Sequence, residues 1–143
     1  MTDTAAPRMI FVNLPVKDVA ASTAFYEAIG LTRNEAFSNA QAAAMNWTDT
    51  IHVMLLDHAF YATFTPKKII DAQTTSGMLI ALSLDSRDGV DALTNAAIEA
   101  GGGEPHGPED HGFMYSRAFT DLGGHGFGPF WMDPNAAATG PEA

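Results

Sequence analysis

The sequence predicts an α+β fold made of two successive modules, each with the order strand, helix and three strands (βαβββ). Three observations lead to this prediction. A strand-like apolar segment ends at an acidic residue twice, near the N-terminus and again in the middle of the chain. A helical pattern with a glycine stop follows each time, and short strand-like segments follow each glycine. A length of 143 residues suits one domain or two small modules that share a core.

The first module is predicted over residues 9–57, after an N-terminal tail over residues 1–8. Its opening strand covers residues 9–17 (MIFVNLPVK). Asp18 is a predicted helix N-cap, and Gly30 stands where a left-handed residue ends the helix. The apolar face of this helix contains Val19, Ser22, Phe25, Tyr26 and Ile29. Three strands are predicted to follow, over residues 31–37, 42–47 and 51–57, with turn-forming residues between them.

A connector is predicted over residues 58–76, with a short helix that starts after Thr65 and Pro66. The second module is then predicted over residues 77–133. It consists of a strand over 78–85, a helix over 88–100 that ends at Gly101 to Gly103, and strands over 103–106, 113–120 and 126–132. Residues 134–143 are predicted to form a mobile C-terminal tail.

Composition excludes several classes of protein. The formal net charge is −10, and only Lys67 and Lys68 are adjacent among seven basic residues, so no track for a nucleic-acid backbone exists. The chain has no cysteine, which excludes disulfides and thiolate metal sites. No apolar run approaches the roughly 20 residues that span a bilayer, so we expect a soluble cytoplasmic protein with no membrane partner.

Several segments, in their order and spacing, resemble the vicinal-oxygen-chelate superfamily, which contains glyoxalases, bleomycin resistance proteins and dioxygenases. The resemblance runs from about residue 9 to residue 133 and rests on LPVKD, FYEAIG, LSLDS and DLGGHGF. With VMLLD, FTPK and FWMDP it is similar, more narrowly, to bacterial predicted lactoylglutathione lyases. The resemblance implies a half-open cleft of mixed β-sheet, a small-molecule ligand, and a divalent metal (Ni, Zn, Fe or Mn) in the enzymes of the superfamily.

The positions that the resemblance assigns to the metal do not carry metal ligands in this sequence. They fall on Phe11, Met54, Leu79 and Gly128. A hard cation needs oxygen or nitrogen donors, and His52 is the one imidazole on the Met54 face of its strand. We therefore predict that no cofactor is bound and that the ancestral metal site is degenerate.

Eight residues are predicted to line the ligand cleft. Asn13 shares a strand face with Phe11, and His52 shares one with Met54. Tyr115 and Arg117 share a face and could grip a carboxylate or phosphate; the alternative pairs Arg117 with Asp121 or Glu109. The full set is Phe11, Asn13, Trp47, His52, Met54, Leu79, Tyr115 and Arg117.

Three other histidines leave alternatives open. His106 and His111 flank a Gly- and Pro-rich stretch in which Glu109, Asp110 and His111 could bind a cation, although a solvated loop is the favoured interpretation. His125 in DLGGH is either a turn residue or a hydrogen-bond donor at the rim of the cleft.

Three functions follow from these residues. The favoured one is a metal-free small-molecule-binding protein of the bleomycin-resistance kind, with an aromatic or cationic ligand. The second is a metal-dependent lyase like glyoxalase I, which the resemblance implies but whose metal ligands are missing, so that enzymatic activity is left open. The third is a dimeric scaffold without a ligand. A homodimer is expected, although the two modules of one chain could instead complete each other.

Overall fold

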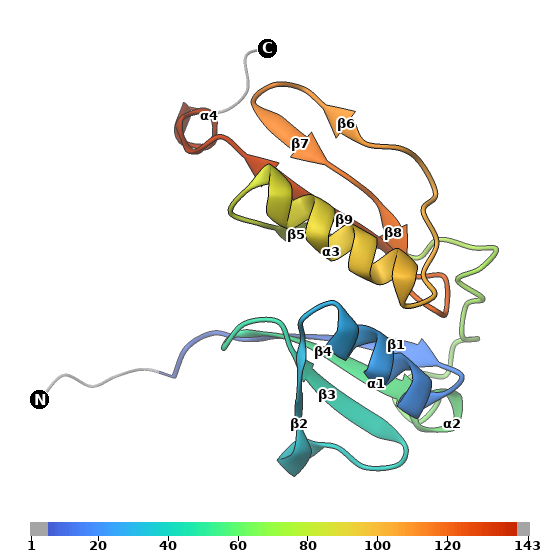
Figure 1. The fold of residues 1–143 in the computed structure, drawn as a ribbon. Coiled ribbons are helices and arrows are strands. Elements are labelled where there is room, and N and C mark those ends of the chain that lie inside the picture. Colours follow the sequence, from blue (N-terminus) through green and yellow to red (C-terminus); the bar gives the residue numbers. More distant parts are fainter. Residues whose placement is uncertain (1–5, 140–143) are drawn as a thin grey trace, which may run out of the picture. The chain divides into compact units, whose positions relative to one another are not determined.

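The computed structural model describes residues 6–139, and the chain divides into two compact units, Met1–Ile69 and Ile70–Ala143. In each unit one long helix lies on one face of a β-sheet (Figure 1). The sheets mix parallel and antiparallel strands, which confirms the predicted α+β class. The boundary between the units falls inside the predicted connector.

The first unit has the predicted βαβββ order. Its elements are β1 (Ile10–Val16), α1 (Val19–Ala28), β2 (Thr32–Asn34), the 3-10 helix η1 (Glu35–Phe37), β3 (Ala42–Asn46), β4 (Ile51–Asp57) and α2 (His58–Tyr61). The strand order is β1-β4-β3-β2. β1 runs parallel to β4, whereas β3 pairs antiparallel with both β4 and β2.

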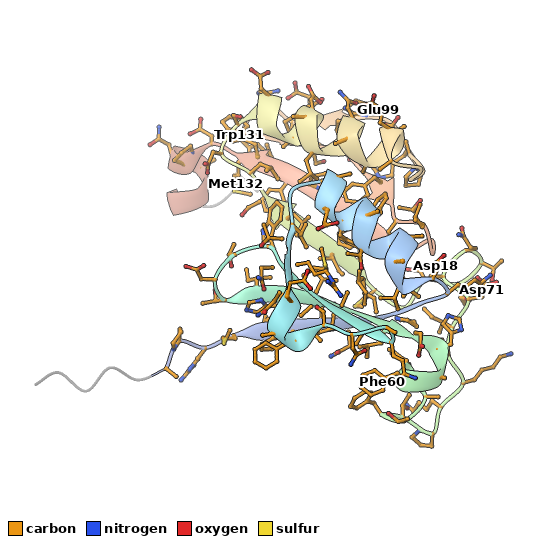
Figure 2. The ribbon with its side chains drawn as sticks, turned by 60° about the horizontal axis from the view of Figure 1, so that its bottom comes forward. Asp18, Phe60, Asp71, Glu99, Trp131 and Met132 are labelled. Atoms are coloured by element: carbon orange, nitrogen blue, oxygen red, sulfur yellow. The ribbon has the colours of Figure 1, made fainter. Side chains whose placement is uncertain are left out.

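Helix α1 begins and ends where the sequence predicts. The Asp18 carboxylate accepts a hydrogen bond from the Ala21 amide (3.1 Å) and caps the first turn (Figure 2). Gly30 ends the helix at a φ of 106°, a backbone conformation that side chains with a Cβ rarely adopt.

The core of the first unit lies between α1 and one face of its sheet. Leu14 of β1 pairs with Leu55 of β4, which pairs with Ala43 of β3, and all three are buried. Phe25 and Tyr26 of α1 are buried as well. Because side chains alternate along a strand, the residues between these positions point to the opposite face of the sheet, which α1 does not cover.

Two predictions for the first unit need correction. The strand predicted over residues 31–37 stops at Asn34, whose side chain accepts a bond from the Ala36 amide (3.1 Å) and turns the chain into η1. The connector does contain a short helix, but it is α2, which Asp57 caps by accepting from the Phe60 amide (2.8 Å). From Thr65 to Met78 the chain forms bends and turns and no helix.

The second unit repeats the pattern with shorter strands. Its elements are β5 (Leu79–Ser83), α3 (Arg87–Glu99), β6 (Glu109–Asp110), β7 (Met114–Ser116), β8 (Phe119–Thr120), β9 (Gly126–Met132) and α4 (Pro134–Thr139). The strand order is β5-β9-β7-β6, and β8 also pairs with β9. Ser86 caps α3 by accepting from the Gly89 amide (2.9 Å), and Gly101 ends it at a φ of 108°.

The predicted strand over residues 113–120 is divided into β7 and β8. The Arg117 amide donates to the Pro129 carbonyl (3.0 Å), but Pro129 has no N–H to return the bond, so the ladder breaks there. The strand predicted over 103–106 is only an isolated bridge between Gly103 and Thr120. β6 was not predicted, because its two residues lie in a stretch rich in Gly and Pro.

The predicted C-terminal tail contains helix α4 over Pro134–Thr139, which begins where the Asp133 carboxylate accepts from the Asn135 amide (2.9 Å). Residues 1–5 and 140–143, the rest of the two predicted tails, lie outside the described residues. Over residues 6–139, no helix combines the length and apolar character needed to cross a membrane.

Candidate functional site

The uncovered face of the first sheet brings together four of the predicted cleft residues. Phe11 of β1 lies directly opposite His52 of β4, and Asn13 lies opposite Met54. These two pairs begin two rows of side chains that cross the sheet. In β3, Asn46 pairs with His52 and Ala44 pairs with Met54, and the row that contains Met54 ends at Asn34 of β2. This register makes a floor that crosses all four strands.

A pocket of about 490 Å³ stands on this floor. Ligand pockets for small organic molecules fall in the range of about 300–1,000 Å³. The pocket is lined by Met9, Phe11, Asn13, Asn34, Phe37, Ala44, Asn46, His52 and Met54. All of these residues belong to the first unit and lie within residues 9–54.

His52 is the most constrained polar side chain of the pocket. Its side chain is buried, with 8% of the residue exposed, and its Nδ1 is 2.7 Å from the Asn46 Oδ1. Phe11 stacks on the imidazole, with ring centroids 4.6 Å apart and planes inclined by 16°. The Nε2 atom is buried and has no hydrogen-bond partner among the described residues. One ring nitrogen is therefore positioned by the protein, and the other is left without a partner.

The rim of the pocket is apolar and exposed. Phe37 of η1 is 71% exposed and Phe11 is 51% exposed, and Met9 is also accessible. Asn13 donates from Nδ2 to the Phe11 carbonyl (3.3 Å) and is exposed. Large apolar side chains that gather around a concavity, rather than singly, are typical of binding surfaces.

Sequence reasoning missed five of the lining residues: Met9, Asn34, Phe37, Ala44 and Asn46. Asn46 and Ala44 had a usable signal, because the hairpin between β3 and β4 places them opposite His52 and Met54. Phe37 had no usable signal in the sequence, because it reaches the rim of the pocket only through the turn of η1. Trp47, which was predicted to line the cleft, follows β3 in the hairpin, where its amide donates to the Ile51 carbonyl (3.0 Å), and it does not line this pocket.

The other three predicted cleft residues lie in the second unit. Leu79 of β5 is on the face of its sheet that lacks α3 and is 79% exposed. Tyr115 and Arg117 point to the opposite face, toward α3. The Tyr115 hydroxyl donates to Asp91 Oδ1 (2.6 Å), and Arg117 donates to the same oxygen (3.2 Å). A role for these residues as ligand contacts stays a prediction.

Arg117 is the centre of this polar cluster, and its side chain is only 11% exposed. Its guanidinium donates to Glu104 (2.9 Å) and Asn95 (2.9 Å) as well as to Asp91, so its acidic partners are not the predicted Asp121 or Glu109. Burial lowers the pKa of Arg117, but the bonds to Glu104 and Asp91 outweigh it and raise the pKa overall.

Hydrogen bonding also shifts two neighbouring groups. The bond to Asp91, helped by burial, raises the pKa of Tyr115 above its usual value. Arg87 donates to Asp110 (2.6 Å), and this bond lowers the pKa of the Asp110 carboxyl. The Arg87 guanidinium also lies over the Tyr115 ring and over Trp131, 5.4 and 5.1 Å from the ring centroids. These contacts attach β6 and β7 to α3.

His106, His111 and His125, the three histidines whose roles the sequence left open, lie outside the helices and strands. The Glu109 carboxylate lies 3.7 Å from His106 Nδ1 and 3.6 Å from His111 Nε2, and all three side chains are about half exposed. His125 is buried at the end of the DLGGH turn, where Asp121 accepts from its backbone amide (2.9 Å). In the described part of the chain, no three His, Cys, Asp or Glu side chains are grouped so that they could hold a metal ion.

The pocket residues do not fit a hard divalent cation. Phe11 and Met54, at the positions that the resemblance assigns to the metal, offer a phenyl ring and a thioether. In the second unit Leu79 and Gly128 offer an alkyl chain and no side chain. His52 is a single imidazole, and its Nδ1 is already bonded to Asn46. A lone imidazole does not hold a catalytic cation against water.

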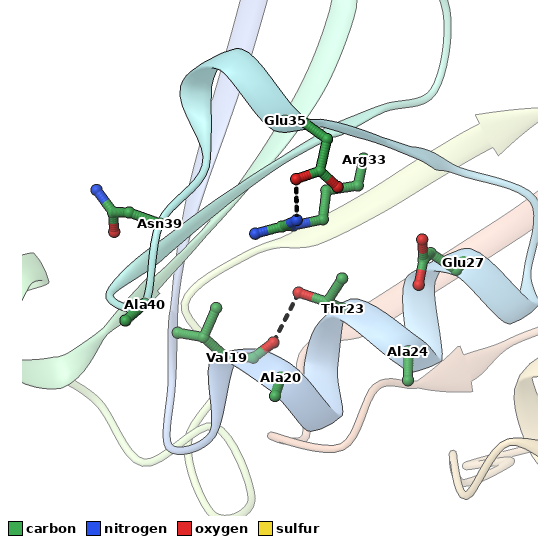
Figure 3. A pocket seen from close by; sticks show the side chains of 9 residues that line it. All are labelled: Val19, Ala20, Thr23, Ala24, Glu27, Arg33, Glu35, Asn39 and Ala40. Atoms are coloured by element: carbon green, nitrogen blue, oxygen red, sulfur yellow. Dashed lines mark hydrogen bonds and ion pairs between the residues drawn. The ribbon is translucent and has the colours of Figure 1, made fainter.

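A second groove, of about 500 Å³, runs between α1 and the segment that contains β2 and η1 (Figure 3). Several of its polar side chains bond to each other or to the backbone. Arg33 pairs with Glu35, and Thr23 Oγ1 donates to the Val19 carbonyl (2.7 Å). Ala24 also lines this groove and lies on the opposite side of the sheet from the pocket.

Comparisons with known proteins agree with this fold. Residues 8–46 match the family described as bleomycin resistance protein-like N-terminal. No curated protein matches the chain in sequence.

Solved structures match nearly the whole chain. A hypothetical protein from S. aureus is 23% identical, with a TM-score of 0.74 over 89% of this chain and 95% of that one. A glyoxalase/bleomycin resistance protein/dioxygenase family enzyme from Burkholderia phytofirmans PsJN is 20% identical, with a TM-score of 0.72 over 88% and 99%. A bleomycin resistance determinant encoded on transposon Tn5 is 21% identical, with a TM-score of 0.59 over 92% and 99%. These solved structures share the fold of this chain, which is the fold of glyoxalases, bleomycin resistance proteins and dioxygenases, and residues 8–46 carry the family match.

Proposed function

We propose that this protein binds a small organic molecule without a metal, in the pocket on the uncovered face of the first sheet. The observation that carries the proposal is the composition of the pocket wall. Apolar side chains make up most of it, and a few polar groups, His52 and three asparagines, are placed among them. Sites for small molecules have this composition, because apolar surface supplies affinity and a few polar groups supply orientation.

The ligand is proposed to be aromatic rather than compact and polar. Phe11, Phe37 and Met9 are exposed around the pocket, and aromatic and thioether side chains favour contact with flat rings. A flat molecule seated on the floor would cover the Met54 and Ala44 row, and it would remove the rim side chains from water. That burial supplies the main driving force.

The portion of the ligand inside the pocket is proposed to be uncharged. The nine lining residues include no Asp, Glu, Lys or Arg. A buried charge with no counter-charge costs far more than a buried neutral group. The net charge of −10 attracts cations only at long range, so a cationic ligand would keep its charge outside the pocket.

The lyase alternative has no specific support in the pocket. Glyoxalase chemistry in this superfamily uses a divalent metal, and the side chains of Phe11 and Met54 do not fit one. The proposed binding function requires only the side chains that are present.

A blocking substitution tests the proposal. Asn13→Trp places a large side chain at an exposed position of the pocket wall, and Ala24→Trp places the same side chain in the second groove. We expect indole to bind the wild-type protein and Ala24→Trp with equal affinity by isothermal titration calorimetry, and to lose binding to Asn13→Trp. Equal binding by both variants, or no binding to the wild-type protein, would contradict the proposal.

A further inference from the structure

The unpartnered nitrogen of His52 indicates what kind of polar group the ligand carries. Nε2 is buried and has no hydrogen-bond partner among the described residues, although it lies in a side chain that lines the pocket. A buried polar atom without a partner costs about 1–3 kcal/mol. Native proteins keep few such atoms, so each of them requires an explanation.

The hydrogen bond at the other ring nitrogen determines the role of Nε2. The Asn46 Oδ1 can only accept, so His52 Nδ1 carries the proton in the 2.7 Å contact between them. In a neutral imidazole the second nitrogen is then a hydrogen-bond acceptor. Nε2 therefore presents a lone pair and requires a donor.

Phe11 covers one face of the His52 imidazole. Its ring stacks on the imidazole, and 51% of Phe11 is exposed, so its side chain borders solvent as well as the pocket. Exposed side chains change rotamer within nanoseconds. Rotation of Phe11 would open the imidazole to an entering molecule, on which the Phe11 ring could then stack.

We propose that the natural ligand is a flat, uncharged aromatic molecule whose N–H or O–H group donates a hydrogen bond to His52 Nε2. This inference rests on the proposed binding function and adds the hydrogen-bonding polarity of the ligand. The pocket would then discriminate against molecules of equal shape that present an acceptor, because the lone pair of Nε2 would face another lone pair.

Two probes of nearly the same shape test the inference. Indole carries a ring N–H, whereas benzofuran has an oxygen at the same position. We expect indole to bind the wild-type protein about five- to tenfold more tightly than benzofuran. This ratio of dissociation constants corresponds to the net free energy of a typical hydrogen bond. In His52→Phe, which keeps a ring beside Phe11 and removes Nε2, the two affinities should become equal through a loss of indole affinity.

Nitrogen NMR of the unmodified protein provides a second measurement that does not depend on a variant. With ¹⁵N-labelled histidine, His52 should show a protonated Nδ1 and an unprotonated Nε2, and the Nε2 resonance should shift when indole binds. Equal affinity of both probes for the wild-type protein, or a protonated Nε2, would overturn this inference and leave the binding function intact. If neither indole nor benzofuran binds the wild-type protein, both proposals are overturned.

Discussion

Phe11 and His52 occupy directly opposed positions on the parallel strands β1 and β4, and their rings stack at a centroid distance of 4.6 Å. The pair joins an exposed aromatic side chain to a buried imidazole. Phe11 stands at one of the positions that the resemblance assigns to a metal ligand, so a hydrocarbon ring is present there in place of a coordinating group.

The Phe11 ring should leave a spectroscopic signature on His52. Protons above an aromatic face are shielded, so the His52 ring protons should resonate upfield of those of the other four histidines in wild-type protein. Phe11→Leu should remove this displacement and cost about 1 kcal/mol of stability, the worth of an aromatic pair. Proton NMR of both proteins tests the stack, and an unchanged His52 spectrum in the variant would contradict it.

Leu14 and Leu79 should respond very differently to truncation. Leu14 is fully buried in the first unit, so Leu14→Ala should cost about 2–5 kcal/mol in urea unfolding. Leu79 is 79% exposed, and Leu79→Ala should change stability by no more than about 0.5 kcal/mol. If Leu79→Ala instead caused a large loss of stability that depends on protein concentration, a second copy of the chain would cover Leu79, as the expected homodimer would allow.

The cluster around Arg117 should contribute to folding. Arg117→Met removes the donor shared by Asp91, Asn95 and Glu104, and should destabilise the protein by about 2–3 kcal/mol, as expected for bonds to charged groups. Arg87→Met removes a more exposed pair with Asp110 and should cost clearly less stability than Arg117→Met. Urea denaturation compares the two. Unchanged stability in Arg117→Met would favour the ligand-contact hypothesis for this residue.

Tyr115 should make stability fall at alkaline pH. Its folded pKa is raised by the bond to Asp91, so its contribution is complete below the unfolded pKa of about 10 and is lost as the pH rises through the folded value. Tyr115→Phe lacks this contribution. The difference in unfolding free energy between the two proteins should therefore be largest near neutral pH and shrink above about pH 10. A difference that grows with pH would contradict the raised pKa.

Gly124 and Gly112 provide a matched pair for the DLGGH turn. Both have positive φ, 93° and 81°. A Cβ at Gly124 would lie 2.7 Å from the Ala72 carbonyl oxygen, whereas one at Gly112 would meet nothing within 4 Å. Gly112→Ala should cost about 1–2 kcal/mol for the backbone alone. Gly124→Ala should cost clearly more, and equal costs in thermal unfolding would show that the turn does not pack against Ala72.

The sequence by itself determined the architecture, because local signals and the repeat agree. The Asp18 cap, the Gly30 stop and the alternation in β1 and β4 act over a few residues, and each appears in the structure where the pattern predicts it. The same alternation placed Phe11 with Asn13 and His52 with Met54 on shared faces. The resemblance indicated Phe11 and Met54, and strand periodicity added Asn13 and His52, which together are four of the nine residues that line the pocket.

Tertiary structure decided what no local pattern encodes. The pairing register brought Asn46 to His52, the turn at Asn34 carried Phe37 to the rim, and the missing N–H of Pro129 divided a predicted strand. The side of the second sheet on which Tyr115 and Arg117 lie also depended on packing, since α3 supplies Asp91 as their common acceptor. Periodicity determines which residues share a face, but only contacts between distant segments determine what that face meets.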